Sequence, residues 1–424
     1  MRRSILLAGA TAVALALSAC GGNGGEEETT AAPAETATAE ETTAAEEGPA
    51  SVEGQLVVWV DDDRQPYVQE AAEAFTEETG VPVELVIKNN EDIRADFAAQ
   101  VPTGQGPDIT VGAHDWIGEF TANGIVSPIQ LGDTAADYNP AAIRAFTYNG
   151  QVYGVPYAVE NLGLIRNVEL APEPAPATFD EMIASGQEIG AEFPFMIQIG
   201  ETGDPYTMYP FQTSFGAPVF LQDADGAYTA ELGMGGDEGR AFAQWLADQG
   251  AAGVLDTAFT YDIVVDQFSS GNVPYIVGGP WMIADFTEAG VEVAVDPIPS
   301  AGGSEAIPFM GVQGFYLSAQ SLNPLQATDF LVNYIGSEET QLALYQAGNR
   351  TPANIAAAEA TADNPVSAGF AAIAEQALPM PAIPEMGSVW SFWGVTEAQI
   401  VSGGDPVELW DKMISDIEGA IAVG

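Results

Sequence analysis

Short apolar runs alternate with segments of helical periodicity through most of the chain, and this alternation constrains the fold more than any other feature. Residues 56–60 (Leu-Val-Val-Trp-Val) form a continuous apolar run, which is typical of a strand buried on both faces. Pro66 begins a helical segment that ends before Gly80, a common stop signal. The pattern then predicts strands at 81–87 and 108–111 and helices at 91–101 and 114–123. Such a βαβαβα order predicts a parallel sheet covered by helices.

The alternation recurs in the second half of the chain, and the C-terminal part is mostly helical. We expect strands at 193–198, 273–277 and 291–295, and helices at 178–188, 237–246, 262–269, from Pro280, and at about 325–346, 366–377, 389–401 and 405–421. With 424 residues, the chain is long enough for two domains of about 150 residues or more each. The sequence therefore predicts two α/β lobes and a helical region at the end.

Two extended apolar runs that contain Pro or Gly are candidate connections between the lobes. They are residues 155–160 (Val-Pro-Tyr-Ala-Val-Glu) and 308–314 (Pro-Phe-Met-Gly-Val-Gln-Gly). If the chain crosses between the lobes at both runs, each lobe is discontinuous in sequence. A ligand would then bind in the cleft between the lobes.

The first residues have the features of a bacterial export signal. Arg2 and Arg3 precede an apolar run over 5–17, which is too short to span a bilayer of about 30 Å. The run ends in Leu-Ser-Ala-Cys20, which resembles the lipobox of bacterial lipoproteins and implies cleavage after residue 19 with lipid on Cys20. An ordinary secretory signal with a stray cysteine is the alternative.

Residues 21–51 have the composition of a solvated tether. They contain eight Glu and no aromatic residue, Val, Ile, Leu or Met. Such a segment buries too little apolar surface to offset the entropy of chain ordering, and its charges keep it extended. We therefore assign 20–53 to a lipidated cysteine and a disordered acidic tether.

The overall charge excludes several classes of partner and site. The chain has 61 Asp+Glu against 10 Lys+Arg, a net charge of -51, with one His and one Cys. An acidic surface of this kind repels nucleic acid and anionic lipid headgroups. One His and one Cys leave no Cys-rich or His-rich metal site. A hydrophobic content of 47% nevertheless supports a large folded core.

The motifs of common enzyme classes are absent. We find no Gly-x-Ser-x-Gly, P-loop or Gly-x-Gly-x-x-Gly pattern. A Ser-His-Asp triad could use only His114, for which the pattern favours a capping or packing role at a helix start. A glycosidase with paired carboxylates stays possible because the chain has many acidic residues.

Several short motifs occur in the same order as in a known transport family. They are Leu56-Val57-Val58-Trp59, Thr103-Gly104-Gln105-Gly106-Pro107-Asp108-Ile109, Ala113-His114-Asp115, Tyr148-Asn149-Gly150, Pro156-Tyr157-Ala158-Val159-Glu160, Gly279-Pro280-Trp281, Pro308-Phe309-Met310-Gly311-Val312 and Met380-Pro381-Ala382-Ile383-Pro384-Glu385-Met386. This series resembles the maltose/maltodextrin-binding proteins, the substrate-binding components of ABC sugar importers.

The resemblance implies a fold and its boundaries. The implied fold is a two-lobed α/β periplasmic-binding-protein type II fold with an interlobe cleft and a C-terminal helical region. One lobe would comprise residues 54–158 and about 313–360, the other about 163–308 and 366–424, with hinges near 155–162 and 308–314. No enzymatic activity, cofactor or metal is implied.

The resemblance also implies the ligand-binding residues. Carboxylates and one cation would bind sugar hydroxyls, and aromatic rings would stack on the apolar faces of the sugar. The residues at these positions are Asp63, Arg64, Asp115, Glu160, Asp204, Tyr206, Trp281 and Trp390. Three other tryptophans, Trp59, Trp245 and Trp410, lie among apolar residues and are predicted to be core.

The chain departs from the family pattern at the aromatic positions. Gly112 stands where the family has a stacking Trp, and Trp116 stands where it has an Arg, so the stacking surface is predicted to have moved to Trp116. At the C-terminal site an Arg and a Tyr of the family are absent, with Ser391 and Gly394 near those positions, and Trp393 is a candidate for additional stacking.

The function expected from these features is binding and delivery of a sugar. The protein would be anchored outside the cytoplasm by lipid on Cys20, bind maltose or maltodextrin by lobe closure, and present it to the membrane subunits of a permease. The alternatives are another oligosaccharide such as trehalose, and a surface glycoside hydrolase.

Overall fold

The computed structural model describes residues 50–224 and 227–423. The predictions for the signal peptide, for Cys20 and for the tether up to residue 49 lie outside these residues. Within the described parts of the chain, no helix has the length and apolar character needed to cross a membrane.

The larger of the two main sheets has eight strands and is of mixed direction. Its order is β14-β7-β13-β3-β1-β2, with β4 and β15 also paired to β13. The bounds are β1 Leu56–Val60, β2 Val83–Ile87, β3 Ile109–Ala113, β4 Val126–Ser127, β7 Gly154–Asn161, β13 Phe309–Ser318, β14 Thr351–Pro352 and β15 Leu378–Pro379. Strand β1 is parallel to β2 and β3, as the sequence predicts, but β13 is antiparallel to β3 and β7. The predicted parallel sheet is therefore confirmed for these three strands, and β13, which comes from a distant part of the chain, makes the complete sheet mixed.

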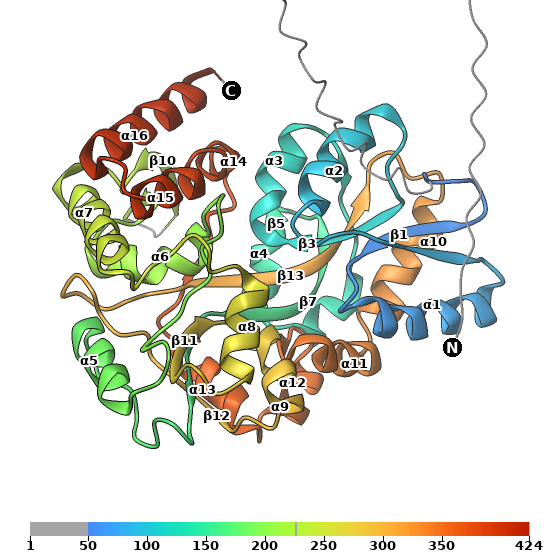
Figure 1. The fold of residues 1–424 in the computed structure, drawn as a ribbon. Coiled ribbons are helices and arrows are strands. Elements are labelled where there is room, and N and C mark those ends of the chain that lie inside the picture. Colours follow the sequence, from blue (N-terminus) through green and yellow to red (C-terminus); the bar gives the residue numbers. More distant parts are fainter. Residues whose placement is uncertain (1–49, 225–226, 424) are drawn as a thin grey trace, which may run out of the picture. The chain divides into compact units, whose positions relative to one another are not determined.

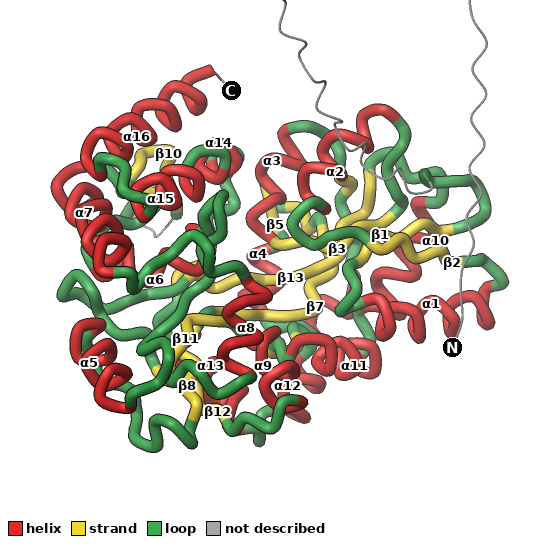
Figure 2. The backbone as a smooth tube through the Cα atoms, in the orientation of Figure 1, coloured by secondary structure: helices red, strands yellow, loops and turns green. Residues whose placement is uncertain are grey.

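The second main sheet has three strands and is antiparallel. Strand β8 (Gly163–Asn167) lies between β11 (Tyr275–Gly278) and β12 (Val293–Asp296). It follows β7 after a single residue, so one extended segment joins the two sheets (Figure 1, with both strands labelled in Figure 2). The predicted strand at 193–198 is wrong: it forms only an isolated bridge between Met196 and Ile276, since Pro194 supplies no backbone donor. Two short hairpins complete the strands: β5 (Thr147–Tyr148) with β6 (Gln151–Val152), and β9 (Phe220–Gln222) with β10 (Tyr228–Leu232).

Helices occupy most of the remaining described chain (Figure 2). Helix α1 shows how local sequence sets their ends: it ends at Gly80, whose φ of 74° is left-handed and whose N–H bonds to the Thr76 carbonyl. The bounds are α1 Gln65–Thr79, α2 Ile93–Gln100, α3 Ile117–Ala122, α4 Pro140–Ala145, α5 Phe179–Ile189, α6 Pro205–Ser214, α7 Gly236–Ala252, α8 Tyr261–Ser269, α9 Ile283–Glu288, α10 Pro324–Asp329, α11 Glu338–Gly348, α12 Ile355–Thr361, α13 Pro365–Ala374, α14 Met386–Trp390, α15 Trp393–Val401 and α16 Pro406–Val423. The C-terminal helices α15 and α16 pack against each other and against α7.

The structure divides two of the predicted long helices. The segment 325–346 consists of α10, a π-helical stretch and α11, because Ser337 caps α11 by accepting the Thr340 N–H. The segment 389–401 is divided between α14 and α15, with Phe392 outside helical geometry. Helices α4, α6 and α12 are absent from the sequence-based prediction. In α6, prolines at 205 and 210 obscure the helical signal.

The buried apolar side chains form three clusters. Core 1 draws on residues from 56–158 and 312–353, core 2 on Ala113 and residues from 162–309 and 380–417, and core 3 on residues from 165–286 and Phe370. The predicted core positions Trp59, Trp245 and Trp410 are at most 9% exposed, which confirms those predictions. The exact lobe boundaries stay a prediction.

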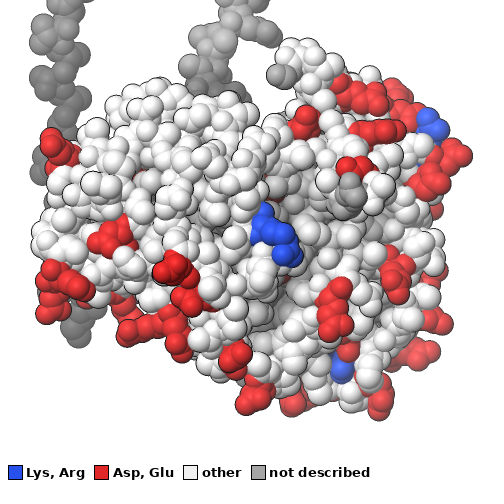
Figure 3. Space-filling model, turned by 180° about the vertical axis from the view of Figure 1, so that it is seen from behind, with Lys and Arg blue, Asp and Glu red and all other residues white. Residues whose placement is uncertain are grey.

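Acidic side chains greatly outnumber basic ones on the surface. Figure 3 shows one face, on which acidic side chains are spread widely and basic ones are few. Of the eight basic residues in the described ranges, all except Arg144 form an ion pair. Most of the scarce positive charge is therefore committed to contacts within the protein.

The carboxylate of Asp108 ties the start of β1 to the end of β13. It is fully buried and accepts hydrogen bonds from the Val57 N–H at 2.9 Å and from the hydroxyls of Ser51 at 2.7 Å and Ser321 at 2.5 Å. The Asn323 amide adds a contact at 3.3 Å. Removing the carboxylate would leave the buried Val57 N–H and two partly buried hydroxyls without this acceptor.

We expect Asp108→Ala to lower the free energy of unfolding by about 3 kcal/mol, because buried donors that lose their partner cost about 1–3 kcal/mol. Urea unfolding followed by circular dichroism measures the change. The exposed Asp133 provides the control, and Asp133→Ala should stay within about 0.5 kcal/mol of the wild type. Equal effects of the two substitutions would contradict the role of Asp108.

Candidate ligand-binding site

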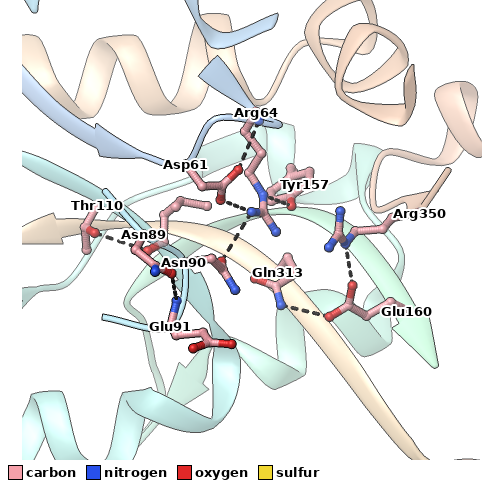
Figure 4. A network of polar contacts seen from close by, with 11 residues as sticks. Asp61, Arg64, Asn89, Asn90, Glu91, Thr110, Tyr157, Glu160, Gln313 and Arg350 are labelled. Atoms are coloured by element: carbon pink, nitrogen blue, oxygen red, sulfur yellow. Dashed lines mark hydrogen bonds and ion pairs between the residues drawn. The ribbon is translucent and has the colours of Figure 1, made fainter. Parts of the chain in front are cut away.

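The turn after β1 places a buried arginine within a protein network. Arg64 is 2% exposed. Its Nη1 pairs with Asp61, and its Nε donates to the Tyr157 hydroxyl. Asn90 Oδ1 lies 3.5 Å from the same Nη1 (Figure 4). The predicted sugar contact of Arg64 stays a prediction; its hydrogen bonds in this structure go to other protein groups.

Asp63, the next residue toward β1, is exposed and lies near two helices of the second half of the chain. Partial burial raises the pKa of Asp285 on α9, and the negative charge of Asp63 raises it further. Asp63 also contributes to the raised pKa of Tyr261 on α8. The predicted ligand carboxylate is therefore close to residues from α8 and α9.

Glu160 and Arg350 form a buried ion pair at the end of β7. Arg350 Nε donates to Glu160 Oε2 at 2.5 Å, and Gln313 Nε2 of β13 donates to Oε1 at 2.8 Å. The Arg350 guanidinium lies 5.2 Å from the centre of the Trp281 ring. Among the described residues, only the Nε of Arg350 forms a hydrogen bond, and Figure 4 shows an Nη group that points away from Glu160.

Arg350 is not among the site residues predicted from the sequence. It follows α11 and precedes β14, more than 180 residues from Glu160 along the chain. The one available signal was its rarity, because few basic residues remain after the signal segment. Its role depends on a pairing that only the folded chain creates.

Trp281 and Tyr206 form an aromatic pair close to this arginine. Their ring centres are 6.4 Å apart, and both side chains are half-buried. The Tyr206 hydroxyl is buried and has no hydrogen-bond partner among the described residues. Burial raises the pKa of Tyr206 well above its usual value, with a further contribution from Glu160, so the hydroxyl keeps its proton.

Asp204 holds the start of α6, the helix that carries Tyr206. Its Oδ1 accepts the Thr207 N–H at 3.1 Å, and its Oδ2 accepts the Thr207 hydroxyl at 2.6 Å and the Gln198 amide. These bonds occupy the carboxylate with protein donors. A direct ligand contact of Asp204 stays a prediction, and the capping bonds position Tyr206.

Asp115 connects residues from distant parts of the chain. Its Oδ2 accepts the Trp390 Nε1–H at 3.1 Å, whereas its Oδ1 is buried and has no partner among the described residues. Burial raises the pKa of Asp115 to about 6, although the nearby Arg94 charge acts in the opposite direction. A buried acceptor atom is thus available beside Trp390.

Trp390 rests on a stack of buried aromatic rings. It packs on Trp393 with ring centres 5.5 Å apart and an interplanar angle of 25°, and Trp393 is fully buried. Trp393 contacts Tyr209, which stacks on Phe309 at 3.6 Å. The ligand contact proposed for Trp393 stays a prediction; in this structure its ring supports Trp390 from beneath.

His114 has the packing role that the sequence favours. It is 1% exposed, its Nδ1 accepts the Val312 N–H at 3.1 Å, and its Nε2 lies 3.2 Å from the Met380 carbonyl. Burial lowers its pKa to about 4, so the ring is neutral and joins three segments. The described residues contain no group of His, Cys, Asp and Glu suited to a metal ion.

These side chains combine aromatic faces with unpaired polar atoms. Trp281, Trp390 and Tyr206 offer half-buried rings, while Asp115 Oδ1 and the Tyr206 hydroxyl are buried and unpartnered. Such a combination suits a neutral ligand with apolar faces and hydroxyl groups at its edges.

Comparison with known proteins defines the class. Residues 70–371 match the model of the bacterial extracellular solute-binding protein family, so the chain belongs to this family. Its members bind solutes and are not enzymes. This confirms the prediction that the protein has no enzymatic activity and makes the glycoside hydrolase alternative wrong.

Particular relatives are named for the sugars they bind. The chain is 29% identical to the maltodextrin-binding protein MdxE of Bacillus subtilis over 81% of this chain and 84% of the relative. It is 27% identical to a maltooligosaccharide ABC transporter solute-binding lipoprotein of Streptococcus pneumoniae (92% and 90%) and 26% identical to a galactooligosaccharide-binding protein of B. subtilis (97% and 95%).

A solved structure confirms the fold. The Thermus thermophilus maltotriose-binding protein bound with maltotriose superimposes with a TM-score of 0.79 at 32% identity, covering 87% of this chain and all of that one. The predicted two-lobed periplasmic-binding-protein fold is therefore confirmed.

The raised pKa of Asp115 gives a pH-dependent prediction. The folded protein favours the protonated carboxyl, since the pKa rises from 3.8 to about 6. The wild type should therefore lose about 2–3 kcal/mol of stability relative to Asp115→Asn as the pH rises from about 4 to 6, with no further change above that. Thermal unfolding of both proteins between pH 3.5 and 8 measures this, and a constant difference in stability would contradict it.

Proposed function

We propose that this protein is the substrate-binding component of an ABC importer and binds maltose or maltodextrin-type oligosaccharides. The observation that carries the proposal is the set of half-buried aromatic rings, Trp281, Trp390 and Tyr206, beside two buried, unpartnered polar atoms, Asp115 Oδ1 and the Tyr206 hydroxyl. The Nη groups of Arg350 also form no hydrogen bond among the described residues. The sugars in the names of the relatives support the same ligand class.

The chemistry of an α-glucoside matches these groups. The C–H faces of each glucose unit would stack on Trp281 and Trp390. Asp115 Oδ1 would accept hydroxyl donors, and the Arg350 guanidinium would donate to hydroxyl or ring oxygens, because it has no acceptor capacity. Glu160 would act partly through Arg350, whose orientation its carboxylate fixes.

We also propose that binding is accompanied by closure of the two lobes. The lobes would follow the boundaries expected from the sequence, 54–158 with about 313–360 and 163–308 with 366–424. The chain would bend where β7 continues into β8 and at the start of β13. The closed form would be delivered to the membrane subunits of the permease.

A second candidate ligand is a galacto-oligosaccharide. A relative with this name aligns with 97% of the chain, and the aromatic and polar groups would also suit a galactoside. Trehalose is a further α-glucoside that the site chemistry admits.

We further propose that lipid on Cys20 anchors the protein outside the cytoplasm. The Leu-Ser-Ala-Cys sequence and the acidic segment after it support this proposal, and one relative is named a lipoprotein. The anchor would hold a water-soluble binding domain near its permease.

Isothermal titration with maltose, maltotriose, trehalose and a galacto-oligosaccharide tests the ligand. We expect binding of the maltose series, and a loss of about fivefold or more in affinity for Trp281→Ala, since a stacked aromatic contributes about 1 kcal/mol or more. Arg350→Gln should weaken binding at least as much. The exposed, ion-paired Arg240 provides a matched control, and Arg240→Gln should leave affinity unchanged. Absence of binding to all four sugars would disprove the proposal.

Replacing Cys20 by Ser tests the anchor in a bacterial host that processes lipoproteins. We expect the wild type in the membrane fraction and Cys20→Ser in the soluble or secreted fraction, because the substituted chain has no acyl acceptor. Immunoblotting of both fractions measures this. Equal membrane association of the two proteins would contradict lipid anchoring at Cys20.

A further inference from the structure

Glu397 is a buried carboxyl group to which the proposed sugar contacts give no role. It lies in α15 and is 1% exposed. Neither of its oxygens has a hydrogen-bond partner among the described residues. Buried polar atoms are normally hydrogen-bonded, so an exception of this kind calls for a physical explanation.

The surroundings of Glu397 keep it protonated. Burial raises its pKa well above the ordinary value of 4.5, and the negative charge of Asp204 raises it further, whereas the Trp393 indole acts in the opposite direction. Burial also raises the pKa of Asp204, but three hydrogen bonds to its oxygens favour its charged form. A second charge on Glu397 would therefore be poorly hydrated and would lie near a like charge.

Within the described chain, Asp204 is the one charged group that acts on Glu397. Helix α15 packs against α6, α7, α14 and α16. The buried faces of α7, α14 and α16 carry apolar residues alone. On α6, burial raises the pKa of Tyr206 and of Tyr209, so both phenols are neutral.

The first turn of α15 lies directly against the turn that leads into α6. A Cβ on Gly203 would overlap the Gly394 carbonyl group, and a Cβ on Gly394 would lie 2.6 Å from the Thr202 carbonyl oxygen. The two backbones are thus in contact with no space for a side chain between them. A shift of α15 away from this turn would break the contact.

Glu397 is placed to disturb both sides of this contact. It lies four residues after Trp393, on the same face of α15, and Trp393 supports Trp390. On the other side, Asp204 caps α6 and so positions Tyr206. A charge on Glu397 would repel Asp204 and move the helix that begins at Trp393 away from the helix that carries Tyr206.

We propose that Glu397 is a proton-dependent positioning residue: its uncharged side chain lets α15 pack on the start of α6, and loss of its proton separates Trp390 from Tyr206 and weakens sugar binding. The inference rests on the proposed function, because it concerns affinity for the same ligand. Sugar affinity is highest where Glu397 carries its proton, and it falls as the pH rises through the range in which Glu397 ionises.

Isothermal titration with maltotriose between pH 5 and about 10 tests the proposal on the full mature chain and on Glu397→Gln. Glutamine has the size of glutamate and does not ionise. The ratio of the wild-type Kd to the Kd of Glu397→Gln should rise about fivefold or more over this range, the scale of a typical coupling between two sites. Every other titrating group, Asp115 included, is the same in both proteins, so the ratio isolates Glu397.

Thermal unfolding without sugar gives a second readout. Since folding raises the pKa of Glu397, the wild type should lose stability relative to Glu397→Gln as the pH rises above 4.5. The difference in Tm should grow by about 2 °C or more between pH 5 and about 7. Glu408 on α16 is exposed, and Glu408→Gln should follow the wild type in both experiments.

The outcomes separate the two proposals. A constant Kd ratio, or a difference in Tm that does not change with pH, would overturn the role of Glu397 and leave the proposed ligand standing. If Glu397→Gln does not fold, as judged by circular dichroism, Glu397→Met replaces it, since it is also uncharged and of similar size. If maltotriose binds to none of these proteins at any pH, the proposed ligand class fails, and this inference fails with it.

Discussion

The buried ion pair between Glu160 and Arg350 is the interaction on which the candidate site depends. A buried charge is costly unless it is paired and hydrogen-bonded, and here Arg350 and Gln313 occupy both oxygens of Glu160. The pair joins β7, β13 and the segment after α11, and it sets the guanidinium over the Trp281 ring. Loss of either partner would leave an uncompensated charge next to the aromatic pair that we assign to ligand binding.

From this pair, a continuous run of aromatic contacts leads to the other end of the site. Trp281 neighbours Tyr206, which packs near Phe309, and Phe309 stacks on Tyr209. Tyr209 contacts Trp393 beneath Trp390. Close-packed rings leave little room for one ring to move without moving the next. The rings of Trp281 and Trp390 are therefore held in a fixed position relative to each other. The rings come from the turn after β11, from α6, from β13 and from the C-terminal helices, so only the folded chain brings them together.

The scarcity of positive charge gives each buried arginine a structural value. The chain has 10 basic residues against 61 acidic ones. A buried arginine that pairs with a carboxylate therefore has few other basic residues that could take its place. Arg64 holds Asp61 and Tyr157, Arg166 pairs with Asp296 at 2.6 Å, and Arg350 holds Glu160. These pairs lie at or near strand ends, where the backbone changes direction and polar groups need partners.

The sequence by itself determined the order of most strands and helices. The spacing of apolar residues and the signals at helix ends, such as Pro66 and Gly80, are local properties of the chain. It also indicated Trp281, Trp390, Asp115 and Glu160 through the order of motifs. It did not reveal that β13 is antiparallel to its neighbours or that residues 193–198 form no strand, since strand pairing depends on backbone that is distant in sequence. It also did not reveal where the long helices are divided. Only the tertiary structure brought Arg350 to Glu160, buried Trp393 beneath Trp390 and laid Trp116 on Gly112. The physical reason is that ion pairs, ring stacking and steric fit act between residues that are close in space, and the sequence records only which residues are close along the chain.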